Sequence, residues 1–303
     1  MEVFLRLLVN VLEEGLIYGI MAMGVYITYS VLSFPDLSVD GTFPLGCCVT
    51  AVLIANGVNP VCALLIAFLC GCAAGLVTGL LHVKLHITDL LSGILVMTAL
   101  WSVNLVILGG KAVFPFYNMP TLFNSGLATL LPGALYRRRV LIVLAVVALI
   151  AKFAEDWFFR TKAGLLLRAA GNNSQYVTEL AIDPGRMKVL GLMLGNGLVA
   201  LSGSVLAQSA ESANVNSGTG MLVMSLAAVV IGLNLFGSLK KWLAPTTMVL
   251  LGSIVYKIAL VVAMQLGLPT NYMKLLMSLL FVAALISGNA MEGRRSRHAI
   301  RGK

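Results

Sequence analysis

Charged residues are scarce in this chain. Only 11% of its 303 residues are Asp, Glu, Lys or Arg, whereas a typical soluble domain has roughly 25%. Apolar residues make up 59% of the chain, and the mean hydropathy is +0.96. Several apolar stretches reach the ~20 residues that a helix needs to cross a bilayer. The composition therefore excludes a soluble globular domain and predicts a polytopic membrane protein.

Strand-like alternation is also lacking. A membrane β-barrel would show segments of about ten residues with alternating hydrophobicity, and the chain has no such segments. In a bilayer, the other way to satisfy the backbone internally is the helix. We therefore predict an all-α fold with about nine transmembrane helices. They are expected near residues 15–32, 42–55, 61–81, 89–108, 139–157, 188–207, 221–235, 244–264 and 272–289.

Motifs for metal, disulfide or phosphate chemistry are missing. The five cysteines form no CxxC and all lie in apolar segments (Cys47, Cys48, Cys62, Cys70 and Cys72), so we expect packing residues rather than a zinc or disulfide framework. His82 and His86 are interpreted as loop histidines, because two ligands do not make a metal site. There is no GxxxxGK[ST] phosphate loop. We expect no metal, no cofactor and no enzymatic activity in this chain.

The net charge of +9 has two interpretations. Nucleic-acid binding requires a basic face on a soluble fold, whereas membrane proteins concentrate Lys and Arg in cytosolic loops. The basic residues gather beside apolar helices, which favours the membrane and argues against a nucleic-acid partner. They form two clusters: Arg160, Lys162, Arg168, Arg186 and Lys188, then Arg294, Arg295, Arg297, Arg301 and Lys303. Both clusters are predicted to be cytosolic, with the N-terminus outside.

Three parts are expected along the chain. Residues 1–14 predict an amphipathic surface helix, residues 15–289 a single transmembrane domain, and residues 290–303 a basic cytosolic tail. Within the domain, the GxxxG series at Gly71, Gly75 and Gly79 predicts close contact between helix backbones.

The loop 160–187 predicts one short cytosolic helix. Gly171 should interrupt the preceding helix, and Asn172 can cap a new one with Gln175 three residues later. Asp183-Pro184-Gly185 should end it. The apolar residues Tyr176, Val177 and Leu180 are expected to share one face. Such a short helix is unstable alone. A partner's groove or the lipid interface would each stabilise it, and the pattern does not choose between them.

Asp36 and Asp40 bracket a Leu-Ser-Val break after the first predicted span. Carboxylates inside a membrane are costly and usually functional, and broken helices in transporters present backbone polar groups to a solute. The alternative, which we favour, is that both residues cap helix ends at the interface.

Neutral polar residues lie in or near other spans. Asn104, Asn196 and Gln208 would either line a pathway or form hydrogen bonds between helices. Glu211, Asn214 and Asn216 follow the sixth span on the outer side. They are candidates for an outer gate or for contact with an external protein.

Two blocks of sequence resemble one family. RAAGNNSQYVTELAIDPGRMKVLGLMLGNGLVALSGSVLAQ, from Arg168 to Gln208, resembles the cytosolic coupling segment and following helix of certain permeases. These are the membrane subunits of ATP-binding-cassette (ABC) importers for branched-chain amino acids and ribose-type sugars. EEGLIYGIMAMGVYITYSVLSFPDLSVDGTFPLG resembles the opening of the same family, and its FPDLSVDGTFPLG part resembles the tryptophan/tyrosine-type branch. The resemblance extends from Gly15 to Gly288.

The resemblance implies a type II ABC importer permease that forms a homodimer in a bacterial inner membrane. A separate ATPase subunit would bind ATP and Mg²⁺ and receive the short helix. An extracytoplasmic binding protein would deliver the solute. The expected substrate is an amino acid, and in the tryptophan/tyrosine-type branch it would be aromatic. The coupling residues would be Asn172, Gln175, Tyr176, Val177, Glu179, Leu180 and Asp183. The alternative is a secondary transporter or channel working alone, and a membrane enzyme ranks last because clustered His, Asp and Glu residues are missing.

Overall fold

The computed structural model describes residues 2–125, 138–239, 242–269 and 272–286. The predicted tail, residues 290–303, lies outside them. The elements are α1 (Glu2–Val25), the π-helix η1 (Tyr26–Val31), α2 (Val39–Ala55), α3 (Pro60–Leu85), α4 (Asp89–Ile107), β1 (Val113–Pro115), α6 (Arg139–Arg160), α7 (Lys162–Asn172), α8 (Ser174–Glu179), α9 (Pro184–Ala210), β2 (Ser212–Asn214), the 3₁₀ helices η3 (Val215–Gly218) and η4 (Gly237–Leu239), α10 (Met221–Leu235) and α11 (Pro245–Gln265), followed by a helix over Met273–Ile286.

The all-α prediction is confirmed, but the span count is only partly supported. Within the described residues, six helices are long and apolar enough to cross a membrane: Arg6–Val31, Pro60–Leu85, Asp89–Ile107, Pro184–Ala210, Val215–Leu235 and Pro245–Gln265. Val39–Ala55 and Met273–Ile286 are apolar but shorter. The 22-residue α6 has Lys152, Glu155 and Asp156 in its second half, which lowers its apolar character.

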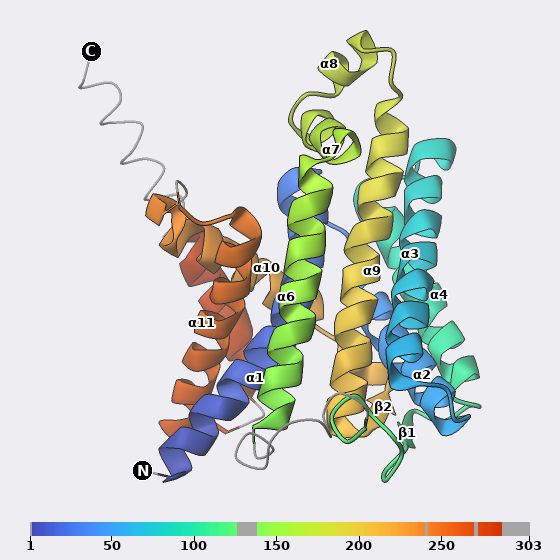
Figure 1. Ribbon diagram of the computed structural model, residues 1–303. Helices are drawn as coiled ribbons and strands as arrows, with labels where there is room; N and C mark the ends of the chain where they lie inside the picture. Colours follow the sequence, from blue (N-terminus) through green and yellow to red (C-terminus); the bar gives the residue numbers. More distant parts are fainter. Residues whose placement is uncertain (1, 126–137, 240–241, 270–271, 287–303) are drawn as a thin grey trace.

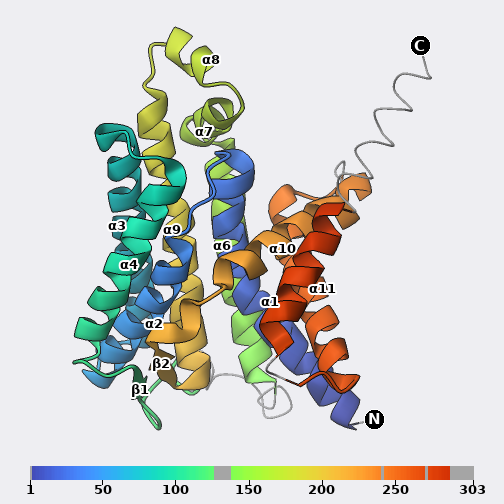
Figure 2. The ribbon, with the colours of Figure 1, turned by 180° about the vertical axis from the view of Figure 1, so that it is seen from behind.

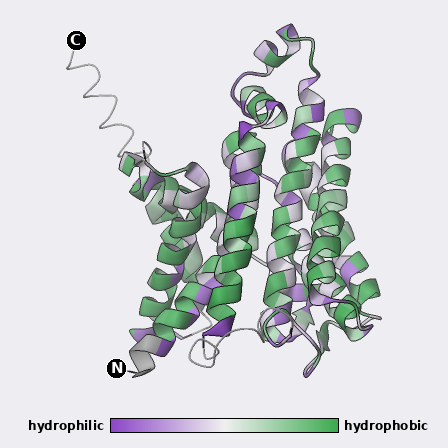
Figure 3. Cartoon of the chain, in the orientation of Figure 1, coloured by the Kyte–Doolittle hydropathy of each residue, from purple (hydrophilic) through white to green (hydrophobic). Residues whose placement is uncertain are grey.

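The two ends of the bundle differ (Figure 1). The short helices α7 and α8 lie at one end, and the paired strands β1 and β2 lie at the other, where α1 also begins. β1 and β2 are antiparallel, with Phe114 opposite Ala213. The view from behind also shows α7 and α8 at one end and β1 and β2 at the other (Figure 2). Hydrophobic residues dominate the long helices between these ends (Figure 3).

α1 crosses the predicted boundary between residues 14 and 15 without interruption. The predicted N-terminal helix and the first predicted span are therefore continuous in α1. Glu14 lies in α1 and its carboxylate forms an ion pair with Lys257 of α11. Lys257 also lies over the ring of Tyr18, with 4.5 Å between its Nζ and the ring centroid. These contacts attach the middle of α1 to α11.

α3 and α9 pack with their backbones close together. A Cβ added at Gly75 would lie 2.2 Å from the carbonyl oxygen of Leu192, and one at Gly71 would lie 2.4 Å from that of Asn196. Only glycine leaves room for a backbone at these distances. The close contact predicted from the GxxxG series is therefore present, and it makes α3 and α9 one tightly packed unit.

Two helices begin inside the bundle rather than at an end of it (Figures 1 and 2). After η1 the chain turns back, and α2 begins near Asn196, the 13th of the 27 residues of α9 counted from Pro184. α10 begins beside α2, because Gly218 lies against the backbone of Asp40. The predicted break after the first span therefore precedes α2, which is one of two helices that begin at the middle of the bundle.

Candidate coupling segment and polar sites between the helices

The segment between α6 and α9 contains two short helices rather than the single one predicted. Thr161 caps α7, since its Oγ1 accepts from the backbone N–H of Gly164 at 3.3 Å. Leu167 is fully buried and joins the main core. Gly171 lies inside α7, where an added Cβ would come within 1.7 Å of the carbonyl oxygen of Val31. Its role is therefore close contact with η1, not interruption of a helix.

α8 is capped by Asn173, not by Asn172 as predicted. The Oδ1 of Asn173 accepts from the backbone N–H groups of Gln175 at 3.0 Å and Tyr176 at 3.4 Å, while Asn172 is the last residue of α7. The chain needs an extended residue between the two helices, and Asn173 supplies it with φ −154°. The sequence offers two adjacent asparagines, so local pattern could not separate them.

The predicted apolar face of α8 is divided. Val177 is fully buried, whereas Tyr176 is 54% exposed and Leu180 is 49% exposed. Val177 is one residue from Tyr176, so on a helix it points about 100° away from it. Val177 attaches α8 to the protein, and Tyr176 and Leu180 remain available to a partner. Gln175 and Glu179 are also exposed.

Asp183 belongs to α9 rather than to the end of α8. Its Oδ1 accepts from the backbone N–H of Gly185 at 2.8 Å, and Pro184 occupies the first turn of α9. α8 itself ends at Glu179, followed by Ala181 in the left-handed conformation with φ 57°. The Asp-Pro-Gly signal was interpreted as a stop, but Asp followed by Pro is equally a helix start.

Asp36 and Asn196 meet in the buried middle of the bundle. Asp36 is 1% exposed. Its carboxylate accepts from the backbone N–H of Ser38 at 2.9 Å and from the Nδ2 of Asn196 at 2.6 Å. The Ser38 hydroxyl donates to the Oδ1 of Asn196 at 3.1 Å. This network holds the start of α2 against the middle of α9.

Asp40 caps the second helix that begins inside the bundle. Its two oxygens accept from the backbone N–H of Gly220 at 3.0 Å and that of Leu222 at 2.8 Å, so it neutralises the positive end of α10. At the start of α2, Asp36 accepts from the backbone N–H of Ser38, the residue that precedes the helix. Asp40 therefore caps α10, a helix distant from it in the sequence, and both aspartates lie at the middle of the bundle rather than at a helix end near the membrane interface.

Asn104 and Gln208 bond between elements. The Nδ2 of Asn104 donates to the carbonyl oxygen of Gly41 at 3.1 Å, and its Oδ1 is buried with no hydrogen-bond partner among the residues that the structure describes. Gln208 donates to the carbonyl of Pro60 at 3.3 Å and accepts from the N–H of Leu122 at 3.0 Å. Of the two interpretations left open for these residues, the geometry favours hydrogen bonding between segments.

Glu211, Asn214 and Asn216 lie in or next to β2, which is at the end of the bundle opposite α8 (Figure 1). Glu211 ends α9 in the left-handed conformation with φ 50°. Asn214 and Asn216 are exposed, and the side chain of Asn214 accepts from the N–H of Asn216 at 2.9 Å. These two residues form part of the surface at this end.

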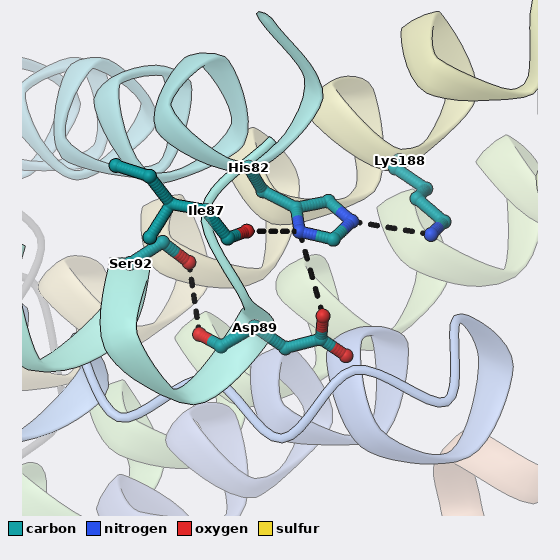
Figure 4. A network of polar contacts seen from close by, with 5 residues as sticks. All are labelled: His82, Ile87, Asp89, Ser92 and Lys188. Carbon is teal, nitrogen blue, oxygen red and sulfur yellow. Dashed lines mark hydrogen bonds and ion pairs between the residues drawn. The ribbon is translucent and has the colours of Figure 1, made fainter. Parts of the chain in front are cut away.

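The sequence interpretation missed two polar features. Glu155 of α6 is 4% exposed, and neither carboxylate oxygen has a hydrogen-bond partner in the described part of the chain. A carboxylate inside a long apolar helix was the available signal. His82 is in the last turn of α3 rather than in a loop, and it contacts both Asp89 and Lys188 (Figure 4). Lys188 lies 106 positions after His82, so sequence pattern could not reveal that contact.

The described residues contain no group of three or more His, Cys, Asp or Glu side chains that could hold a metal ion.

Comparison with known families decides the class of the protein. Residues 7–285 match the family described as "Branched-chain amino acid transport system / permease component". The chain belongs to this permease family. It is a multi-pass membrane permease, and the resemblance to ABC importer permeases stated from the sequence is confirmed.

Several curated proteins are similar to this permease. A tyrosine transport system permease protein of Clostridioides difficile is 43% identical over 284 residues, which cover 93% of this chain and 91% of the relative. An uncharacterized protein of Rickettsia prowazekii is 30% identical over 291 residues, covering 93% and 98% of the two chains. The ribose import permease protein RbsC of Escherichia coli is 26% identical over 231 residues, covering 74% and 68%. No solved structure matches the chain.

Proposed function

We propose that this permease is the membrane subunit of an ATP-driven importer and forms the pathway for an amino acid. The observation that carries the proposal is α8, a capped helix of six residues that projects from the end of a membrane bundle (Figure 1). Val177 fixes it to the protein, while Tyr176 and Leu180 present apolar side chains outward. Exposed apolar side chains on a helix are a common means of binding a partner's groove.

The end that carries α7 and α8 is assigned to the cytosol. Arg160, Lys162, Arg168 and Arg186 lie in or beside these helices, and short cytosolic loops of membrane proteins are rich in Arg and Lys. In this topology α2, α6 and the helix Met273–Ile286 also cross the membrane, giving nine spans, and the C-terminal tail is cytosolic. The strands β1 and β2 then face the exterior.

The partner on the cytosolic side would be an ATPase subunit that binds ATP and Mg²⁺. Movement of α8 would pass to the bundle through two connections. Val177 joins α8 to the buried interior, and Asp183 caps the long helix α9 only a few residues further on. The candidate contact residues Asn172, Gln175, Tyr176, Glu179 and Leu180 are all exposed.

The pathway would form between two copies of the chain, close to the helix starts at the middle of the bundle. Broken helices in transporters often present their ends to the solute near the bilayer midplane. Asp36 is enclosed, but Asp40 is only partly buried and stands between α2 and α10. On the exterior, Asn214 and Asn216 would contact the solute-binding protein.

An aromatic amino acid is the proposed substrate. The tyrosine transport permease is 43% identical over nearly the whole chain, whereas the ribose permease is 26% identical over about three quarters of it. Transport specificity in such a system also depends on the external binding protein, so the proposal concerns the complete importer.

Reconstitution tests this function. Proteoliposomes containing the permease and its ATPase, with the binding protein outside, should accumulate radiolabelled tyrosine only when ATP and Mg²⁺ are enclosed. ATP-dependent uptake of leucine or ribose with no uptake of tyrosine would contradict the substrate assignment.

A transporter working alone is the second candidate, and Glu155 is the observation that favours it. Ionisable residues inside membrane helices often serve proton-coupled transport, and this buried carboxylate has no hydrogen-bond partner among the described residues. That function predicts tyrosine uptake driven by a pH gradient without any ATPase. Loss of such uptake in Glu155→Gln would establish it in place of the importer.

A further inference from the structure

An open cavity lies at the end of the bundle beside α8. Its volume is about 500 Å³, within the range of roughly 300–1,000 Å³ that is usual for small-molecule sites. The turn between α3 and α4 borders it on one side, and the starts of α8 and α9 border it on the other. Its polar lining includes His82, His86, Asp89, Ser174 and Lys188.

His82 stands between the two charged groups of this cavity (Figure 4). Its Nδ1 lies 2.9 Å from the carbonyl oxygen of Ile87 and 3.4 Å from a carboxylate oxygen of Asp89. Its Nε2 lies 3.2 Å from the Nζ of Lys188. A carbonyl only accepts and an ammonium group only donates. The two ring nitrogens therefore face partners of opposite kind, an acceptor at Nδ1 and a donor at Nε2.

The imidazole keeps Lys188 and Asp89 apart. They form no ion pair with each other in the described part of the chain; each instead contacts one nitrogen of the same ring. Asp89 also remains 41% exposed in its side chain. The cavity thus presents a cation and a carboxylate separated by one imidazole ring plus two polar contacts. An α-amino acid has an ammonium group and a carboxylate on one carbon, and each can contact the cavity side chain of opposite charge.

We propose that this cavity binds a free α-amino acid, whose carboxylate contacts Lys188 and whose ammonium group contacts Asp89. A phosphate or other simple anion is a poorer match, because Asp89 would repel it. The Ser174 hydroxyl at the first residue of α8 adds a hydrogen-bonding group on the third side of the cavity.

Such a ligand would join α4, α8 and α9. Asp89 is the first residue of α4, and Lys188 lies in the second turn of α9. A bound amino acid would oppose separation of the α8–α9 segment from the α3–α4 turn and would slow transport when product accumulates inside. This inference rests on the proposed function, which places the cavity in the cytosol and makes an amino acid the product.

Equilibrium binding to the purified permease in nanodiscs, without any binding protein, tests the site. Radiolabelled tyrosine should bind saturably and should be displaced by unlabelled tyrosine. Tyramine, which lacks the carboxylate, and 4-hydroxyphenylpropionate, which lacks the ammonium group, should each compete at least tenfold less well. Equal competition by 4-hydroxyphenylpropionate would show a simple anion site and overturn the proposal.

Variants locate the binding. Lys188→Met and Asp89→Asn should each weaken tyrosine binding at least tenfold. Lys188→Arg, which keeps the positive charge, should retain much of the binding. Lys84→Met is the matched control, because Lys84 is an exposed lysine on the same α3 turn as His82 that does not line the cavity. No detectable binding, or binding that Asp89→Asn leaves unchanged, would contradict the proposal.

The transport assay separates this inference from the proposed function. Tyrosine enclosed in proteoliposomes should lower the initial rate of ATP-driven uptake several-fold in the unmodified importer and not in Asp89→Asn. Normal uptake without inhibition by enclosed tyrosine would refute the inference alone. Absence of ATP-driven uptake, with tyrosine still bound at Asp89 and Lys188, would refute the proposed function alone.

Discussion

The interface between α3 and α9 and the short helix α8 are held in opposite ways. The interface depends on glycines that let two backbones touch, as at Gly75 and Leu192. α8 is six residues long, and Val177 is its one buried residue. The interface resists any change of shape, whereas α8 exposes apolar groups that the fold itself does not need. A rigid unit beside an exposed helix is the arrangement expected of a protein moved by a partner.

Removal of a contact glycine should have the largest effect. In Gly75→Ala the new Cβ would lie 2.2 Å from a backbone carbonyl oxygen, so α3 and α9 must separate. We expect a loss of about 3 kcal/mol in the free energy of unfolding, measured by SDS titration in mixed micelles. Gly79→Ala is the matched control, because its nearest atom would be 3.0 Å away, and it should cost about 1 kcal/mol. Equal losses would refute the close-contact account.

Removal of the buried hydrogen bonds of Asp36 should have the second largest effect on stability. Asp36→Ala removes two hydrogen bonds to a carboxylate, from Ser38 and Asn196, and should cost about 2–3 kcal/mol of unfolding free energy. Asp183→Ala removes an exposed helix cap and should cost about 1 kcal/mol. The same SDS titration compares the two variants. A smaller loss for Asp36→Ala than for Asp183→Ala would show that the network at the middle of the bundle contributes little.

Charges on the exposed face of α8 should affect binding and not folding. Tyr176→Glu with Leu180→Glu should reduce capture of the ATPase subunit at least tenfold, or about 1.4 kcal/mol, with unchanged thermal unfolding. Thr178→Glu, which adds one negative charge about 200° around the helix from Tyr176, should retain capture. Retention of the ATPase by the double variant would remove α8 from the interface.

The smallest effect is expected at Glu155. Its carboxylate has no hydrogen-bond partner in the described structure, and an unpaired buried charge is unfavourable. Glu155→Gln should therefore leave the free energy of unfolding unchanged or slightly higher, and ATP-driven uptake intact. Thermal unfolding and the uptake rate measure both. A variant that folds but no longer transports would show that Glu155 takes part in the transport cycle.

The long-range pattern of this protein could be predicted from its sequence better than its local detail. Hydropathy predicted the helical bundle, and spaced glycines predicted a close helix contact on α3 but not that α9 is the partner. Both signals repeat over many residues. The position of one helix cap does not repeat, so Asn172 and Asn173 could not be distinguished, and Asp183 was assigned to the wrong helix.

Contacts between distant segments could not be predicted from the sequence for a different reason. Asp36 and Asp40 were expected at helix ends near the membrane interface, whereas their position in the middle of the bundle depends on Asn196 and on the start of α10. The charges around His82 come together only because α3, α4 and α9 meet at one end. Side-chain position in such cases is decided by tertiary packing, which one local stretch of sequence does not encode.

The sidedness of α8 tests the central claim most directly. In a variant without the five native cysteines, single cysteines at Tyr176 and Asn214 would be treated with a membrane-impermeant thiol reagent, first on intact cells and then on inverted vesicles. Tyr176→Cys should react only in inverted vesicles, and Asn214→Cys only in intact cells. Labelling of Tyr176→Cys from the outside would contradict the assignment of α8 to the cytosolic partner.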